Sequence, residues 1–330
     1  AVQDRFKITD QGSNHESCFL GLEVLYDREL GVLNLHCDDY FRRSIGTLGI
    51  DLDSLRSAST PIIKDGMVGS PPVEDVLLRD DQLRTLSGII NYAATVCRPD
   101  LAVAASLLSS TRWGEISVTD LNRGKRVLQY IAGCLRHKPR LGLRYCRNVF
   151  STLTAALSLV GYADSDYAGD MASCKSRSGH VLFFCNAAVY WRSRLQDIVA
   201  ISSTAAEIIS LSDLCRELLW ICHLLADLGF SQRLVPLYED NKPAIHIPYS
   251  ANLSHRVRHL RIRDLWVRSI VRTDVCRVYY CRTTENLADF MTKILSGRPF
   301  QNATLAISGY SCTLHIPPQV SPADLEEYDG

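Results

Sequence analysis

Four acidic residues in the C-terminal half of the chain are suited to bind divalent metal ions together. Asp164, Glu207, Asp240 and Asp289 follow one another in the order D-E-D-D, with spacings of 43, 33 and 49 residues. These spacings exclude a single helix face, so only a tertiary fold can gather the four side chains. Clustered carboxylates hold pairs of Mg²⁺ ions about 4 Å apart in enzymes that hydrolyse phosphodiesters. The pattern therefore predicts a two-metal nuclease site.

Each of these acids lies in a local pattern that predicts a different structural element. Short apolar, β-prone runs end at Asp164 and at Asp240, which places both acids at strand ends. Ser202 to Thr204 offer N-caps for a long helix that has Glu207 in or near its first turn. Asp289 follows a strand and a turn and should be carried inward by a short helix.

Strand alternation makes two further predictions for the same region. Residues 181–184 and 188–191, joined through Cys185 and Asn186, predict a hairpin that pairs with the strand before Asp164. Glu239 is the immediate neighbour of Asp240, so the two side chains should point to opposite sides of their strand. Glu239 is therefore expected to face away from the metal site.

Residues 157–296 resemble the ribonuclease H domain of copia-type (Ty1/copia) retrotransposon Pol polyproteins. Five motifs of that family occur here in order, at Tyr162–Asp170, Ser176–His180, Trp191–Ile208, Asp240–Ala244 and Ala288–Lys293. The resemblance implies an α/β, ribonuclease H-like domain in which a mixed central sheet is flanked by helices. It also implies an endoribonuclease that cleaves the RNA strand of RNA–DNA hybrids.

The resemblance also implies roles for the four acids around two Mg²⁺ ions, with Mn²⁺ as an alternative. Asp164 would bridge the two ions, and Asp289 would help to hold the ion that activates water. Glu207 and Asp240 would hold the ion near the leaving oxygen. Departures from the family pattern bear on activity: in the T-E-A-E-Y motif, Ala205 replaces the first acid and Ile208 replaces the aromatic residue.

The upstream sequence is similar to the region that precedes ribonuclease H in the same family. Residues 1–63 resemble the C-terminal remnant of a reverse transcriptase, residues 64–80 predict a linker, and residues 81–146 predict a helical connection segment. Residues 297–330 predict a disordered tail. A polymerase needs an aspartate pair in a β-hairpin, and Asp38-Asp39-Tyr40, the nearest candidate, has the reverse order and is expected to be a solvated turn. No polymerase activity is expected of this chain, although a polymerase-bearing chain of the same element is a candidate partner.

A basic segment at 254–272 predicts a surface that binds nucleic acid. If this segment is a helix, four arginines lie on one face of it. The other faces carry Trp266, Val267, Ile270 and Val271. The cationic side would contact backbone phosphates of the hybrid. A solvated surface helix is the alternative interpretation. The four arginines are Arg258, Arg261, Arg268 and Arg272.

Composition narrows the class of protein further. The chain has 330 residues, 46% hydrophobic residues and a formal net charge of zero, so affinity for nucleic acid must come from local patches. Its 12 cysteines include no C-x-x-C pair, which predicts buried free thiols in a reducing compartment. No long apolar segment or secretory signal is apparent, which predicts an intracellular protein, cytoplasmic or nuclear, with no membrane partner.

Two alternatives to the ribonuclease H hypothesis stay open. An inactive descendant with the same fold would bind nucleic acid or a protein partner without cleaving it. A D-D-E transposase or integrase shares the fold class, but its last ligand should be a Glu on a late helix, where this chain has Asp289.

Overall fold

The structure is a computed structural model that describes residues 16–63, 78–111, 113–146, 157–249 and 261–311. Most of the predicted linker at 64–80 lies outside the described residues, as does Arg258.

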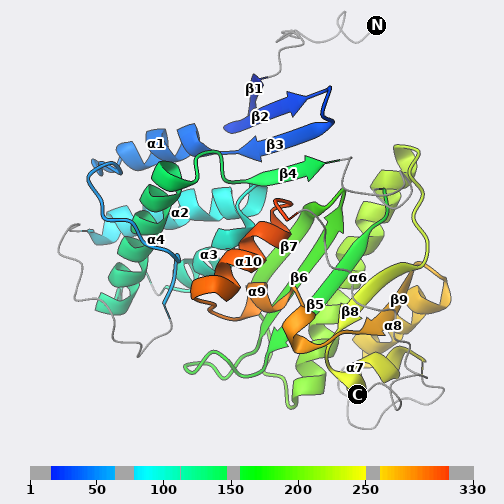
Figure 1. The fold of residues 1–330 in the computed structure, drawn as a ribbon. Coiled ribbons are helices and arrows are strands. Elements are labelled where there is room, and N and C mark those ends of the chain that lie inside the picture. Colours follow the sequence, from blue (N-terminus) through cyan, green and yellow to red (C-terminus); the bar gives the residue numbers. More distant parts are fainter. Residues whose placement is uncertain (1–15, 64–77, 112, 147–156, 250–260, 312–330) are drawn as a thin grey trace, which may run out of the picture.

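A five-stranded mixed sheet occupies the C-terminal half of the chain (Figure 1). Its strands are β5 (Val160–Asp166), β6 (Arg177–Phe184), β7 (Ala187–Leu195), β8 (Val235–Glu239) and β9 (Cys276–Tyr280). They lie in the order β7-β6-β5-β8-β9; β6 is antiparallel to both neighbours, and β5, β8 and β9 are parallel. With helices on both of its faces, this sheet confirms the expected ribonuclease H-like architecture.

The predicted hairpin is formed by β6 and β7. Cys185 and Asn186 connect the two strands and have φ angles of +51° and +70°. Positive φ at both central residues is the requirement of the two-residue turn that matches the right-handed twist of paired strands.

Each face of this sheet has its own hydrophobic core. Tyr162 of β5 and Tyr238 of β8 pack into a large core that is shared with the N-terminal half of the chain. Ala163 and Leu237, one position along the same strands, belong to a second core on the opposite face. The helices on this second face are α6 (Ser203–Asp227) and α8 (Arg261–Arg272), with α7 (Lys242–His246) and η3 (Ile247–Tyr249) nearby.

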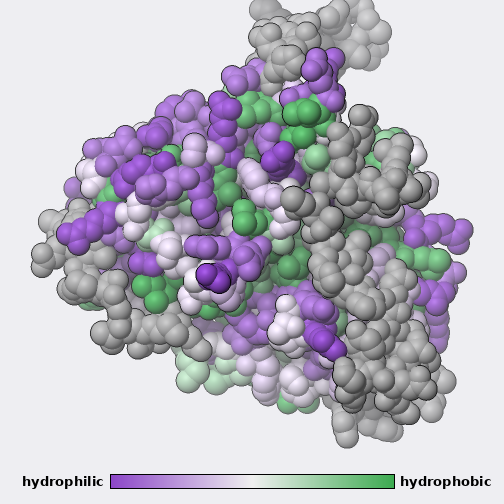
Figure 2. Space-filling view, in the orientation of Figure 1, coloured by the Kyte–Doolittle hydropathy of each residue, from purple (hydrophilic) through white to green (hydrophobic). Residues whose placement is uncertain are grey.

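The N-terminal half contains a second, four-stranded antiparallel sheet, in the order β1-β2-β3-β4. Its fourth strand comes from the predicted connection segment, so the segments 1–63 and 81–146 share one sheet. Phe19 and Leu20, at the turn between its first strands, are 66% and 76% exposed, and Figure 2 shows hydrophobic surface over this sheet. The strands are β1 (Glu16–Phe19), β2 (Leu22–Asp27), β3 (Val32–His36) and β4 (Leu143–Cys146).

The expected packed helices of the connection segment are present. A buried ion pair lies between them: the Arg98 guanidinium donates to both Asp100 carboxylate oxygens, at 2.8 and 2.6 Å, and the Tyr130 hydroxyl donates to Asp100 at 2.7 Å. Within the described residues, no helix has both the length and the apolar character to cross a membrane. The helices of the connection segment are α2 (Asp80–Val96), η1 (Pro99–Leu101), α3 (Ala102–Ser109) and α4 (Val118–His137); α1 (Asp38–Gly46) precedes them in the segment 1–63.

Two expectations for local structure are corrected. Asp38 and Asp39 open α1 rather than forming a solvated turn, and the Asp38 carboxylate accepts the backbone amide of Arg140 at 2.7 Å. The predicted disordered tail is wrong for residues 297–311, because α10 (Gly297–Ile307) packs Phe300 and Ile307 into the large core. The acidic, proline-containing end of the tail lies outside the described residues.

Candidate metal centre

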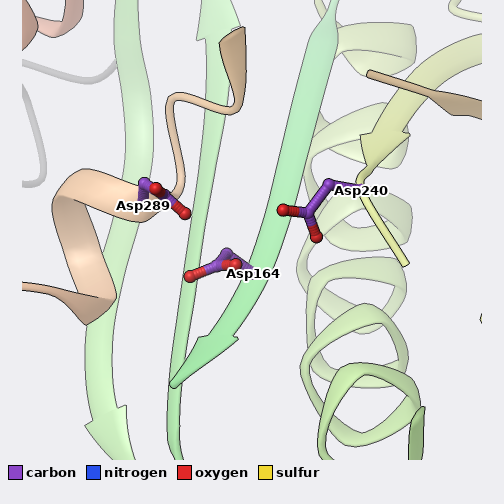
Figure 3. Close-up of side chains that lie close together, drawn as sticks. All are labelled: Asp164, Asp240 and Asp289. Atoms are coloured by element: carbon purple, nitrogen blue, oxygen red, sulfur yellow. The ribbon is translucent and has the colours of Figure 1, made fainter. Parts of the chain in front are cut away.

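Three of the predicted acids meet at one edge of the five-stranded sheet (Figure 3). Asp164 lies near the end of β5, Asp240 directly follows β8, and Asp289 is the first residue of α9 (Asp289–Thr292). One carboxylate oxygen from each lies within 4.8 Å of the others. Because β5 and β8 are parallel, their carboxyl ends reach the same edge. We call these three residues the outer triad.

The fourth predicted acid, Glu207, belongs to a second group with Glu239 and Asp240. Their carboxylate oxygens again lie within 4.8 Å of one another, and we call these residues the inner triad. The expectation that Glu239 faces away from the site is therefore wrong. Glu239 does point to the face of the sheet that carries Leu237, but α6 crosses that face and brings Glu207 to meet it.

Helix α9 is held over the sheet by one buried asparagine. The Asn286 amide nitrogen donates to the carbonyl of Ala163 in β5 at 2.8 Å, and the Asn286 amide oxygen accepts the backbone N–H of Ala288 at 3.0 Å. Asn286 directly follows η5 (Thr283–Glu285) and is 4% exposed. It therefore fixes the start of α9, and with it Asp289, relative to Asp164.

Three further side chains, which the sequence analysis did not single out, orient the carboxylates. The Thr292 hydroxyl donates to Asp164 Oδ2, and the Thr283 hydroxyl donates to Asp240 Oδ2 at 2.7 Å. Lys293 Nζ lies 2.7 Å from Asp289 Oδ1 and 4.0 Å from Asp164 Oδ2. Thr292 and Lys293 are the last two residues of the Ala288–Lys293 motif, so that motif contained the signal that identifies them.

Burial and mutual repulsion make the ionised carboxylates costly. Burial, followed by the charge of Asp289, raises the pKa of Asp164 from 3.8 to about 7. Burial, followed by the charges of Asp164 and Asp240, raises the pKa of Glu207 well above its ordinary value. The pKa of Glu239 is also raised well above the ordinary value, by burial and then by Glu207. Such a set of acids gains stability from a bound cation.

Stability without metal is expected to fall as the pH rises from about 4 to about 7. Between these values the folded chain keeps a proton on Asp164 that the unfolded chain has already lost, so raising the pH toward 7 favours unfolding. Melting temperatures measured in EDTA should decrease by several degrees, and saturating Mg²⁺ at pH 8 should restore them. Equal pH dependence with Mg²⁺ and with EDTA would contradict this account, and Asp164→Asn should flatten the EDTA curve.

The residues present fit a hard divalent cation. Every donor in the two triads is a carboxylate oxygen, the ligand type that Mg²⁺ and Mn²⁺ prefer. Glu207 Oε2 and Glu239 Oε2 are buried, and neither has a hydrogen-bond partner among the described residues. Buried carboxylate oxygens without a donor are uncommon in folded proteins, and a cation would satisfy them.

The predicted basic surface is only partly present. Arg261 and Arg272 are exposed at the two ends of α8, and Arg258 lies outside the described residues. The assignment of Arg268 to this surface is wrong, because its side chain is 3% exposed and its Nε donates to Asp264 Oδ1 at 2.7 Å. Arg268 lies inside the packed length of the helix, where α8 contacts α6 and β9.

Arg268→Ala is expected to destabilise the fold rather than weaken a surface contact. It leaves the buried Asp264 carboxylate without this partner, and breaking a buried pair costs about 3 to 5 kcal/mol. Urea unfolding would measure the change in the free energy of unfolding. Arg272→Ala, on the same helix but exposed, is the control and should change that energy by less than about 0.5 kcal/mol. Equal effects of the two substitutions would place Arg268 on the surface after all.

No protein-family model matches the chain. The chain is 27% identical over 302 residues to the retrovirus-related Pol polyprotein from transposon TNT 1-94 of Nicotiana tabacum, covering 90% of this chain and 22% of that protein. It is 32% identical over 239 residues to the corresponding polyprotein from transposon RE2 of Arabidopsis thaliana, covering 72% and 15%. It thus spans less than a quarter of these relatives' length. Among solved structures, LC11-RNase H1 isolated from compost is similar at 15% sequence identity and a TM-score of 0.34. The superposed region covers 41% of this chain and 92% of the LC11-RNase H1 chain.

Proposed function

Because the chain belongs to the family of copia-type retrotransposon Pol polyproteins, we propose that it is a ribonuclease H that hydrolyses the RNA strand of RNA–DNA hybrids. The observation that carries the proposal is the meeting of Asp164, Glu207, Asp240 and Asp289 at one sheet edge. They come from two strand ends and two helices and share Asp240 as the common member of two carboxylate groups. This arrangement supports a two-metal hydrolytic site.

The four acids would hold two divalent cations, Mg²⁺ or Mn²⁺. When bound, such a pair lowers the pKa of a coordinated water and stabilises charge on the leaving oxygen. The chain's own contribution is to fix the carboxylates in advance. Thr292 donates a hydrogen bond to one oxygen of Asp164, and Thr283 donates one to an oxygen of Asp240. The other oxygen of each aspartate can therefore turn toward a ligand.

Lys293 supplies the only positive charge that the described residues place within ion-pair distance of the outer triad. Its ammonium group partly compensates Asp289 and Asp164 while the fold forms. In the proposed enzyme it also restrains Asp289, because the pair is spaced i, i+4 across α9 and its C-cap.

The exposed Arg261 and Arg272 remain proposed phosphate contacts, since neither is committed to the core. The polymerase activity of a complete Pol polyprotein is not part of the proposal. A polymerase-bearing chain of the same element is a proposed partner.

Incubation of the purified chain with end-labelled RNA–DNA hybrid tests the proposal directly. In Mg²⁺ we expect cleavage of the RNA strand, and in EDTA we expect none. Double-stranded RNA and double-stranded DNA of the same sequence should stay intact. Binding of the hybrid without cleavage would instead support an inactive descendant that retains the fold, and cleavage of all three duplexes would remove the assignment to ribonuclease H.

A further inference from the structure

Glu239 occupies an unusual position for an acid that lies outside the D-E-D-D set. Its side chain is 0% exposed at the end of β8. Its Oε1 accepts the backbone N–H groups of Asp240 and Asn241, at 3.1 and 3.2 Å, and its Oε2 has no hydrogen-bond partner among the described residues. One oxygen thus holds the turn after β8, while the other has no described donor.

The inner and outer triads differ in how their negative charge is compensated. Lys293 provides a resident cation for the outer triad. For the inner triad, the described part of the chain offers no Lys, Arg or His side chain that forms an ion pair with Glu207 or Glu239. Both of these glutamates are at least 95% buried, and each has an Oε2 without a donor. Buried charge of this kind requires a proton or a cation.

The spacing of the oxygens suits a cation. Oxygens on opposite sides of an ion lie about 4.2 Å apart for Mg²⁺ and about 4.8 Å apart for a larger ion such as Ca²⁺. The inner triad places its three oxygens within 4.8 Å of one another, so a small inward movement closes it around Mg²⁺ or Mn²⁺. Strand alternation explains why Glu239 takes part, because it projects to the face that α6 covers, and α6 carries Glu207.

We propose that Glu239 is a fifth metal ligand, which together with Glu207 and Asp240 holds one divalent cation on the α6 side of the sheet. The inference rests on the proposed metal centre and adds to it. Asp240 is the residue that the two triads share, so this cation would lie next to the one at the outer triad, where Asp164 stays the expected bridging ligand.

A titration of the metal-free chain with Mn²⁺ tests this ligand. Calorimetry measures the heat of binding, and electron paramagnetic resonance measures the Mn²⁺ that stays free. Glu239→Gln removes the charge but keeps an amide oxygen to accept the two backbone N–H groups. We expect it to weaken at least one Mn²⁺ binding step tenfold or more. Glu217→Gln is the matched control on α6, where Glu217 pairs with Arg216 at 3.0 Å, and it should stay within twofold of the wild type.

Melting temperature in EDTA separates ligand loss from misfolding. Glu239→Gln should melt at the same temperature as the wild type or higher, because it removes a buried charge. Mn²⁺ affinity equal to that of the wild type, or a wild-type chain that binds no Mn²⁺, would overturn the inference. A third outcome separates the two proposals. If Glu239→Gln weakens Mn²⁺ binding but the wild-type chain does not cleave the hybrid, the proposed function is rejected and Glu239 remains a metal ligand.

Discussion

Asp164→Asn is expected to reduce cleavage of the RNA–DNA hybrid by at least about 1,000-fold while the chain stays folded. Asp164 is 2% exposed and is a member of the outer triad with Asp240 and Asp289. The amide has nearly the same shape as the carboxylate, and its oxygen can still accept from the Thr292 hydroxyl. What the substitution removes is the negative charge that a divalent cation requires.

The stability of this variant provides an independent check. Since burial and Asp289 make the ionised Asp164 costly, Asp164→Asn should melt in EDTA at a temperature equal to or above that of the wild type. Asp197→Asn is the control, because Asp197 lies in the same half of the chain with its side chain 72% exposed. Cleavage by Asp164→Asn within tenfold of the wild type would remove Asp164 from the site.

The double variant Asp164→Asn, Asp240→Asn should cleave the hybrid only slightly more slowly than Asp164→Asn alone, because the effects of residues that act as a unit are not additive.

The sequence predicted the positions of the acids well where a strand or helix end determines them. Apolar runs that stop at Asp164 and Asp240 indicate strand ends, and parallel pairing then brings those ends to one edge. Ser202 was a sound N-cap prediction, since its hydroxyl accepts the Ala205 amide at 3.1 Å and α6 begins one residue later. Strand ends and helix N-caps depend on residues that are adjacent in the sequence, so the sequence alone can predict them.

The errors arose where the result depends on what lies opposite a side chain. Alternation correctly gave the direction of Glu239 but contained no information that α6 would place Glu207 there. The helical wheel gave the direction of Arg268 around the axis of α8. It did not show which positions along that axis are covered by neighbouring elements, and this coverage is what buries Arg268. Composition favoured disorder after residue 297, and two apolar side chains seven residues apart, Phe300 and Ile307, were enough to dock α10.

Gly179→Ala is expected to impair both stability and cleavage, although the substitution adds one methyl group. Gly179 lies in β6 directly opposite Asp164 of β5, under the start of α9. A Cβ at this position would lie 2.6 Å from Thr292 Cγ2, 2.7 Å from Met291 Cβ and 2.9 Å from the Ala288 carbonyl oxygen. Two of these three atoms are fixed by the backbone of α9, so the helix itself must move.

Displacement of α9 moves the residues that complete the outer triad. Asp289 is the first residue of this helix, Lys293 is its C-cap, and Thr292 donates to Asp164. Overpacking of this kind costs about 1 to 3 kcal/mol, and a misplacement of about 1 Å lowers a reaction rate by about 100-fold. Urea unfolding and hybrid cleavage would measure the two effects.

Gly88→Ala is the matched control for the added methyl group. Gly88 lies inside α2, and a Cβ there would meet no atom within 4 Å. Alanine in a helix is favoured over glycine by about 0.5 to 1 kcal/mol, so this variant should be more stable than the wild type and cleave at the same rate. If Gly179→Ala behaved like Gly88→Ala, close contact between β6 and α9 would not be what positions Asp289. If it retained stability but lost cleavage, the small residue at 179 would serve the geometry of the site alone.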